Sequence, residues 1–192
     1  MTAERRRTIA DAALRVLATA GPRGLTHRAV DAEAGLKPGA VNYHAPSKSR
    51  LLDLAVERLF DLDIDTAATT LLLPETTPPN PETMSEALVG FVREMTAPEH
   101  VYRVRARHEL LAEALRNPRL HQLFAAQRAA FVHYAGQLLT RMGCPSATPH
   151  ADLLVVFIDS LLTRQAMITA EPLTVPTLRT AAQRHLRSCL EP

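Results

Sequence analysis

The stretch LTHRAVDAEAGLKPGAVNYHAPSK, residues 25–48, decides the fold of this chain. Thr26 can cap a first short helix, because its hydroxyl can accept a hydrogen bond from a free amide of the first turn. Gly35 can end this helix in a left-handed conformation at little cost. Pro38 suits the first turn of a second helix, where a missing N–H costs nothing. The stretch therefore predicts two short helices joined by a tight turn.

The second helix, expected over residues 37–44, has one clearly apolar side chain, Val41. Its other side chains are small, polar or aromatic, so one side of the helix is free to face outward. Pro46 ends this helix, and Ser47 caps the next one. A short helix that presents hydrogen-bonding groups suits insertion into the major groove of DNA. We therefore expect a helix-turn-helix whose second helix contacts base edges.

These residues resemble the TetR-type transcriptional repressors. The signature of that family is a helix followed by Ala-Gly-Val, a short helix ending in Tyr-His-Phe or similar, and a Lys after Ser or Asn. The corresponding segments here are Ala34-Gly35-Leu36, Val41-Asn42-Tyr43-His44-Ala45 and Ser47-Lys48. Ala45 replaces a bulky apolar residue, Asn42 a common Tyr, and Asp31 a common small residue. The resemblance extends from the N-terminus to Leu52.

The resemblance also implies which side chains meet DNA. It assigns phosphate contacts to Thr26, Tyr43, His44 and Lys48, and base contacts to Arg28, Lys37, Pro38, Gly39, Ala40 and Asn42. Arg28 or Lys37 would favour guanine, and Asn42 would favour adenine. The alternative is that Tyr43 packs within the small N-terminal bundle and that His44 caps a helix end.

Charge is unevenly distributed along the chain. Residues 1–50 contain nine Lys or Arg and four Asp or Glu, a net charge of +5. Because the whole chain carries +2, the remainder carries −3. A basic N-terminal part on a mildly acidic body suits phosphate binding at one end of the protein.

The spacing of apolar residues predicts an all-α fold of about nine helices. Outside the helix-turn-helix, they are expected at roughly 4–20, 47–73, 82–96, 98–116, 118–142, 150–170 and 175–189. The segment PETTPPNP, residues 74–81, is the clearest linker, because its prolines cannot continue a helix. We expect an N-terminal helix-turn-helix DNA-binding domain, residues 1–47. A helical effector-binding and dimerisation domain, residues 48–192, is expected to follow.

Residues 153–162 are apolar nearly all round, and such a helix must be covered on every side. The other helices of the body are too few to surround it, so its second face needs another subunit. The resemblance implies the same, because TetR-like proteins pair through their last two long helices. We expect a homodimer formed through the last two helices, which binds double-stranded DNA at a palindromic operator.

Polar groups interrupt the apolar stripes of the body helices. Arg105 and His108 lie on an expected inner face with Val104, and Gln127 lies between two Phe residues. The residues expected to line a mostly apolar pocket for a small-molecule effector are Met84, Leu88, Phe91, Met95, Arg105, His108, Phe124, Gln127, Phe131 and Asp159. The alternative for each polar member is a core or interface group that another side chain satisfies. Asp159 in particular can belong to the dimer interface.

We therefore expect a DNA-binding transcriptional repressor that a small molecule releases from its operator. Two alternatives remain open: a helix-turn-helix dimer without an effector, and a helical ligand-binding protein or enzyme with a vestigial DNA head. The sequence has no nucleophile elbow, glycine-rich phosphate loop or His-x-x-x-His pair, so we expect no enzyme, metal or cofactor. Cys144 and Cys189 suggest no disulfide framework, and no apolar run is long enough to span a bilayer. The expected location is the cytoplasm, without a membrane partner.

Overall fold

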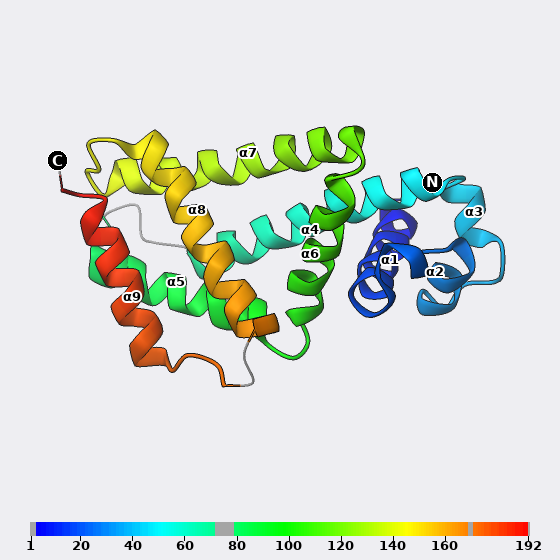
Figure 1. Ribbon diagram of the computed structural model, residues 1–192, viewed down its shortest axis with the longest axis horizontal. Helices are drawn as coiled ribbons and strands as arrows, with labels where there is room; N and C mark the ends of the chain where they lie inside the picture. Colours follow the sequence, from blue (N-terminus) through cyan, green and yellow to red (C-terminus); the bar gives the residue numbers. More distant parts are fainter. Residues whose placement is uncertain (1–2, 72–78, 169–170, 192) are drawn as a thin grey trace. The chain divides into compact units, whose positions relative to one another are not determined.

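The structure is a computed structural model that describes residues 3–71, 79–168 and 171–191. These residues form nine α-helices and one π-helical turn, and no strand, which confirms the predicted all-α fold (Figure 1). The helices are α1 (Ala3–Gly24), α2 (His27–Glu33), α3 (Ala40–His44), α4 (Lys48–Thr70), α5 (Pro81–Thr96), α6 (Val101–Ala114), α7 (Pro118–Arg141), α8 (Ala147–Thr163) and α9 (Val175–Ser188), with the turn η1 (Arg164–Ile168) after α8. None of the described helices is long and apolar enough to cross a membrane.

Local capping explains the start of α5. The Asn80 side chain accepts a hydrogen bond from the Thr83 amide at 2.9 Å, and the Thr83 hydroxyl accepts one from the Asn80 amide at 3.2 Å. Pro81 follows at the first helical position, where its missing N–H costs nothing. Most of the predicted linker, residues 74–78, lies outside the described residues.

The chain divides into two compact units, each with its own core. The first contains α1–α3, α4 as far as Leu62, α6, and α7 as far as Gln127. The second contains the rest of α4 from Asp63, α5, the rest of α7 from Arg128, and α8 to α9. These units are defined by packing, so the expected functional division into residues 1–47 and 48–192 stays a prediction.

In the first unit α1 packs along α6. The Arg15 guanidinium of α1 lies 4.3 Å from the centre of the Tyr102 ring of α6, which is close enough for a cation–π contact. The buried face of α6 contains Arg103, whereas Arg105 is exposed. The predicted inner face of α6 was therefore wrong at Arg105, because the helices that pack against α6, and not apolar spacing alone, decide which side is covered.

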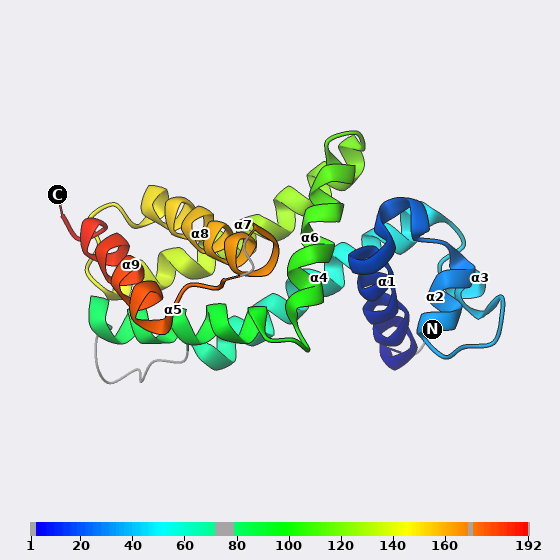
Figure 2. The same ribbon diagram turned by 60° about the horizontal axis from the view of Figure 1, so that its bottom comes forward.

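In the second unit α9 packs along α5, as both ribbon views show (Figures 1 and 2). Leu178, Ala182 and Leu186 of α9 are each at most 1% exposed. Two ion pairs border this contact, Arg179 with Glu86 and Arg187 with Glu82, the second at 2.6 Å. The apolar side of α9 is thus used within the chain.

Helix α8 begins at Ala147, earlier than the predicted residue 150, and ends at Thr163. Its buried side chains include Leu154, Val155, Ile158 and Leu162. Its other face leaves two large apolar side chains open, with Leu153 55% exposed and Val156 47% exposed. The second unit therefore covers one side of this apolar helix and leaves another side free.

His185 on α9 is a titratable group packed inside the second unit. Its ring stacks on Phe157 of α8, with the ring centres 4.5 Å apart and the planes 6° apart. Burial lowers the pKa of His185, and the nearby His150 lowers it further. Between the lowered pKa and the ordinary value of 6.5 the unfolded chain binds more protons, so acid favours unfolding.

We therefore expect the melting temperature, followed by circular dichroism, to fall as the pH drops below about 6.5. His185→Phe keeps an aromatic ring against Phe157 and removes the titrating group. The melting temperature of this variant should therefore fall less than that of the parent over the same pH interval. An equal fall in the variant and the parent would show that His185 does not cause the acid sensitivity.

Candidate nucleic-acid interface

Helix α2 begins and ends as its sequence predicts. The Thr26 hydroxyl accepts a hydrogen bond from the Ala29 amide at 3.1 Å, which confirms Thr26 as the N-cap. Gly35 follows the helix with a φ of 62°, the left-handed conformation that a glycine adopts at little cost. The Leu36 amide then bonds back to the Asp31 carbonyl at 2.8 Å. These bonds close the tight turn of the predicted helix-turn-helix.

Helix α3 begins at Ala40, so its predicted start near Pro38 was wrong. Pro38 lies in the turn before the helix, and Gly39 is the N-cap with a φ of 88°. A residue in this left-handed conformation interrupts a right-handed helix, so α3 cannot extend back through Gly39. The helix is only five residues long, Ala40–His44.

Three contacts from the neighbouring residues hold α3. Val41 is fully buried, which confirms it as the apolar anchor. Asp31 of α2 accepts hydrogen bonds from the amides of Gly39 and Val41, each at 2.8 Å. His27 of α2 donates from Nε2 to the Ala45 carbonyl at 2.6 Å. Both ends of α3 are thus bonded to side chains of α2.

Sequence reasoning missed these two side chains of α2 and treated Asp31 only as a departure from the family pattern. A signal was present, since His27 and Asp31 are four residues apart and so share a face of the helix. Gly39 also has no side chain with which to cap α3, so an acceptor for the first amides had to come from elsewhere.

The outward side of α3 and its flanks carries the predicted DNA-binding residues. The exposed ones are Thr26, Arg28, Lys37, Pro38, Gly39, Asn42, Tyr43 and Lys48, and the half-buried ones are Ala40 and His44. Tyr43 is 85% exposed and meets the His44 ring edge-on, with the ring centres 5.0 Å apart. The alternative that Tyr43 packs within the bundle is therefore wrong.

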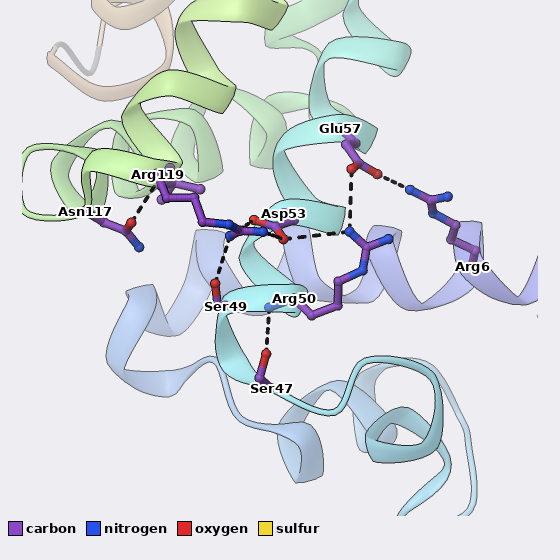
Figure 3. Close-up of polar contacts among 9 residues, drawn as sticks. Arg6, Ser47, Ser49, Arg50, Asp53, Glu57, Asn117 and Arg119 are labelled. Atoms are coloured by element: carbon purple, nitrogen blue, oxygen red, sulfur yellow. Dashed lines mark hydrogen bonds and ion pairs between the residues drawn. The ribbon is translucent and has the colours of Figure 1, made fainter.

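The start of α4, which carries Lys48, is fixed by a cap and by ion pairs (Figure 3). The Ser47 hydroxyl accepts from the Arg50 amide at 3.1 Å, which confirms Ser47 as the cap. Asp53 is 2% exposed and accepts two hydrogen bonds from Arg119 of α7, one of them at 2.6 Å. These bonds to Asp53 raise the pKa of Arg119.

Other ion pairs extend this network to α1. The Arg50 guanidinium lies 3.7 Å from the carboxylate of Asp53 and 3.7 Å from that of Glu57. Glu57 also accepts from Arg6 of α1, and Arg119 donates to the Ser49 hydroxyl at 2.9 Å. Figure 3 shows these side chains meeting along α4. Within the first unit, the helix that carries Lys48 is thus bonded to both α1 and the first turn of α7.

The residues predicted to line an effector pocket fall in both compact units. The second unit contains Met84, Leu88, Phe91, Met95, Phe131 and Asp159, and the first contains Arg105, His108, Phe124 and Gln127. The Phe91 and Phe131 rings lie 6.3 Å apart, and Phe124 packs edge-on against Phe60 at 4.9 Å. The effector pocket itself stays a prediction.

The polar members of this set have separate surroundings. Arg105 is exposed and His108 is half-buried. Gln127 lines a cavity of about 520 Å³ beside the charged side chains of Arg6 and Arg58. The Asp159 carboxylate lies 3.8 Å from the Arg128 guanidinium, which also bonds Asp152 at 3.0 Å. No group of three or more potential metal ligands occurs in the described part of the chain.

A second surface lies between α7 and α8 in the second unit. It is a groove of about 680 Å³ lined by small and polar residues: Ala129, Val132, His133, Gly136, Gln137, Thr140, Arg141, Ala147, Thr148 and Ala151. Leu153 and Val156, the exposed apolar residues of α8, follow in the same helix. The lining thus combines small side chains of both helices with longer polar side chains of α7.

The helix-turn-helix and the helical body both match family models. Residues 9–55 match the model described as bacterial regulatory proteins of the tetR family, and residues 79–192 match the tetracyclin repressor-like C-terminal domain. This chain belongs to the TetR family. TetR-family proteins are transcriptional regulators, and the family is not one of enzymes. No curated protein matches this TetR-family chain in sequence.

Solved structures share the TetR fold over almost the whole chain. A TetR-family member of Streptomyces coelicolor A3 is 27% identical, with a TM-score of 0.74, covering 95% of this chain and 98% of its own. The multidrug binding protein EbrR, complexed with imidazole, is 28% identical, with a TM-score of 0.68 and coverage of 96% and 90%. A transcriptional regulator of Rhodococcus sp. Rha1 is 21% identical, with a TM-score of 0.75 and coverage of 98% and 96%, and shows the fold alone.

Proposed function

We propose that this TetR-family protein is a dimeric, cytoplasmic transcriptional repressor that binds a palindromic operator and leaves it when a small molecule binds. The observation that carries the DNA-binding part is the arrangement of α3. One fully buried residue, Val41, and the bonds from α2 hold its inner side, while Asn42 and Tyr43 are exposed. A helix held in this way can enter a major groove without disturbing the core of its own unit.

The side chains around α3 divide by the chemistry that they offer. Lys37 and Arg28 are exposed cations suited to guanine, and Asn42 offers the paired donor and acceptor suited to adenine. Lys48, at the start of α4, and the Tyr43 hydroxyl suit phosphates on either side of the groove. Phosphate contacts position the protein, and the base contacts of α3 select the sequence.

Dimerisation through α7 and α8 fits the second unit best. Helix α8 exposes Leu153 and Val156, and the groove between α7 and α8 has small residues along it. Helix α9 buries its apolar side against α5, so we place the interface on α7 and α8 and not on the last two helices. A two-fold dimer would present two α3 helices to major grooves about 34–36 Å apart.

Effector binding is supported by the fold and by the apolar body. EbrR, which shares the fold, has been crystallised with imidazole, ethidium and malachite green. Met84, Phe91 and Met95 supply buried apolar surface in the second unit. An effector acts only through its difference in affinity between the DNA-binding state and the released state, and about 1–3 kcal/mol is typical.

Selection of bound duplexes from a random DNA pool tests this function. We expect one palindromic sequence to be enriched, with half-sites about one helical turn apart. If no sequence is enriched, the result would favour the alternative in which the helix-turn-helix no longer binds DNA. Ethidium can serve as a first effector probe, on protein-bound fluorescent operator and with free duplex as the control for intercalation. A panel of apolar cations and acids extends this test. If none of them releases the protein from its operator, the result would favour a regulator without an effector.

Lys48→Ala and Asn42→Ala are expected to separate positioning from sequence readout. Lys48→Ala should weaken binding to all duplexes and reduce the salt slope by about 0.9 per lost phosphate contact, hence about 1.8 for a dimer. Asn42→Ala should leave the salt slope unchanged and relax the preference at one base pair per half-site by about 1–3 kcal/mol. Fluorescence anisotropy across a salt series measures both. If the salt slope of Lys48→Ala equals that of the parent, Lys48 does not contact a phosphate.

A further inference from the structure

The first amides of α3 are bonded to a carboxylate from another helix. Asp31, near the end of α2, is 4% exposed. Its Oδ2 accepts from the Gly39 amide and its Oδ1 from the Val41 amide, each at 2.8 Å. Hydrogen bonds to an ionised acceptor are about twice as strong as neutral ones. The side chain therefore fixes both the left-handed turn at Gly39 and the first turn of the helix.

The other end of α3 is bonded to the same helix. His27 is one turn before Asp31 on α2, and its Nε2 donates to the Ala45 carbonyl at 2.6 Å. Ala45 is fully buried and caps the end of α3. The two side chains of α2 thus bond both ends of α3, Asp31 at the N-cap Gly39 and at Val41, and His27 at the C-cap Ala45.

A helix of five residues needs this support. Forming the first turn of a helix is unfavourable, and short isolated helices are unstable in water. The N-cap of α3 is Gly39, which forms no side-chain cap bond. The exposed side of α3 gains nothing from packing in the free protein, so the order of α3 depends on the burial of Val41 and on the hydrogen bonds from α2.

We propose that Asp31 is a positioning residue for base readout: its carboxylate, assisted by His27, orders α3 against α2 before DNA is present. This inference rests on the proposed DNA-binding function. A prearranged α3 binds without the cost of ordering it, whereas an α3 released from Asp31 must be ordered at each binding event. Of the proposed phosphate contacts, that of Tyr43 depends on α3, whereas that of Lys48 on α4 does not. The base contact of Asn42 depends on α3 entirely, so loss of Asp31 should weaken specific binding more than non-specific binding.

A second acidic residue of α2 provides a control for the effect of charge on DNA binding. Asp31 and Glu33 are both acidic residues of α2, and Glu33 is exposed. Asp31→Ala and Glu33→Ala remove the same charge from the same helix. If charge alone mattered, each change would tighten binding to DNA, because each removes a repulsion from phosphates. A loss of affinity in Asp31→Ala together with a gain or no change in Glu33→Ala therefore comes from the position of α3.

The experiment measures operator and non-specific duplex affinity by fluorescence anisotropy in the full-length protein. For Asp31→Ala we expect operator affinity to fall by about 10–100-fold and non-specific affinity by less than about threefold. Asp31→Asn keeps one acceptor oxygen and should fall between Asp31→Ala and the parent. Equal losses on both duplexes, or no loss on either, would overturn the proposal. If Asp31→Ala does not fold, the same comparison is made with Asp31→Asn.

Hydrogen exchange gives a second readout that needs no DNA. In Asp31→Ala the amides of Gly39 and Val41 should exchange faster than in Glu33→Ala, while amides in the middle of α1 stay protected. Unchanged exchange at Gly39 and Val41 would overturn the ordering role. If the parent protein shows no preference for any duplex, the proposed function fails, and the exchange measurement still decides whether Asp31 orders α3.

Discussion

Replacing Leu153 and Val156 of α8 together by Glu is expected to turn the protein into a monomer and to weaken operator binding by about 100-fold or more. Both side chains are large, apolar and about half exposed in the single chain. Placing carboxylates there would require burying unpaired charges in a dimer interface, which is costly. Each subunit would then bind one half-site, without the gain that a second linked site provides.

The measurement combines analytical ultracentrifugation with anisotropy on the selected operator. Leu115→Glu is the matched control, because Leu115 is 83% exposed and lies in the first unit at the end of α6. This control should remain a dimer with parental affinity. If the Leu153→Glu/Val156→Glu variant sediments like the parent, the dimer interface does not include this face of α8.

Removing the arginines that meet Asp53 is expected to destabilise the first unit more than removing Asp53 itself. The Asp53 side chain is 3% exposed, whereas those of Arg119 and Arg50 are 60% and 37% exposed. In Asp53→Ala the two arginine side chains, which are already partly exposed, can be solvated by water without moving. In the Arg50→Ala/Arg119→Ala double variant, a buried carboxylate loses both cations, and an unsatisfied buried group costs about 1–3 kcal/mol.

Urea denaturation followed by circular dichroism measures this order of stabilities. Asp53→Asn, which removes the charge and keeps the size, should be closer to the parent than the double variant. If Asp53→Ala were the less stable protein, the ion pairs of α4 would contribute more than the burial of the carboxylate costs.

The helix-turn-helix was accessible from the sequence because its signals are local. Thr26 and Ser47 cap helices through amides three residues away, and Gly35 ends a helix through its own φ. Val41 was identified as the anchor because it is the one apolar residue of its segment. The apolar stretch 153–162 likewise indicated a helix with more apolar surface than one chain covers, and Leu153 and Val156 are exposed in the structure.

The sequence by itself thus determined the order of the helices, the caps of α2 and α4, and the outward residues of α3. The tertiary structure alone decided where α3 begins, because that depends on Asp31 reaching the amides of Gly39 and Val41 from another helix. It also decided that α6 buries Arg103 and exposes Arg105, and that α9 uses its apolar side on α5. Caps act within a few residues of their own helix, whereas these choices depend on which distant surface each helix meets.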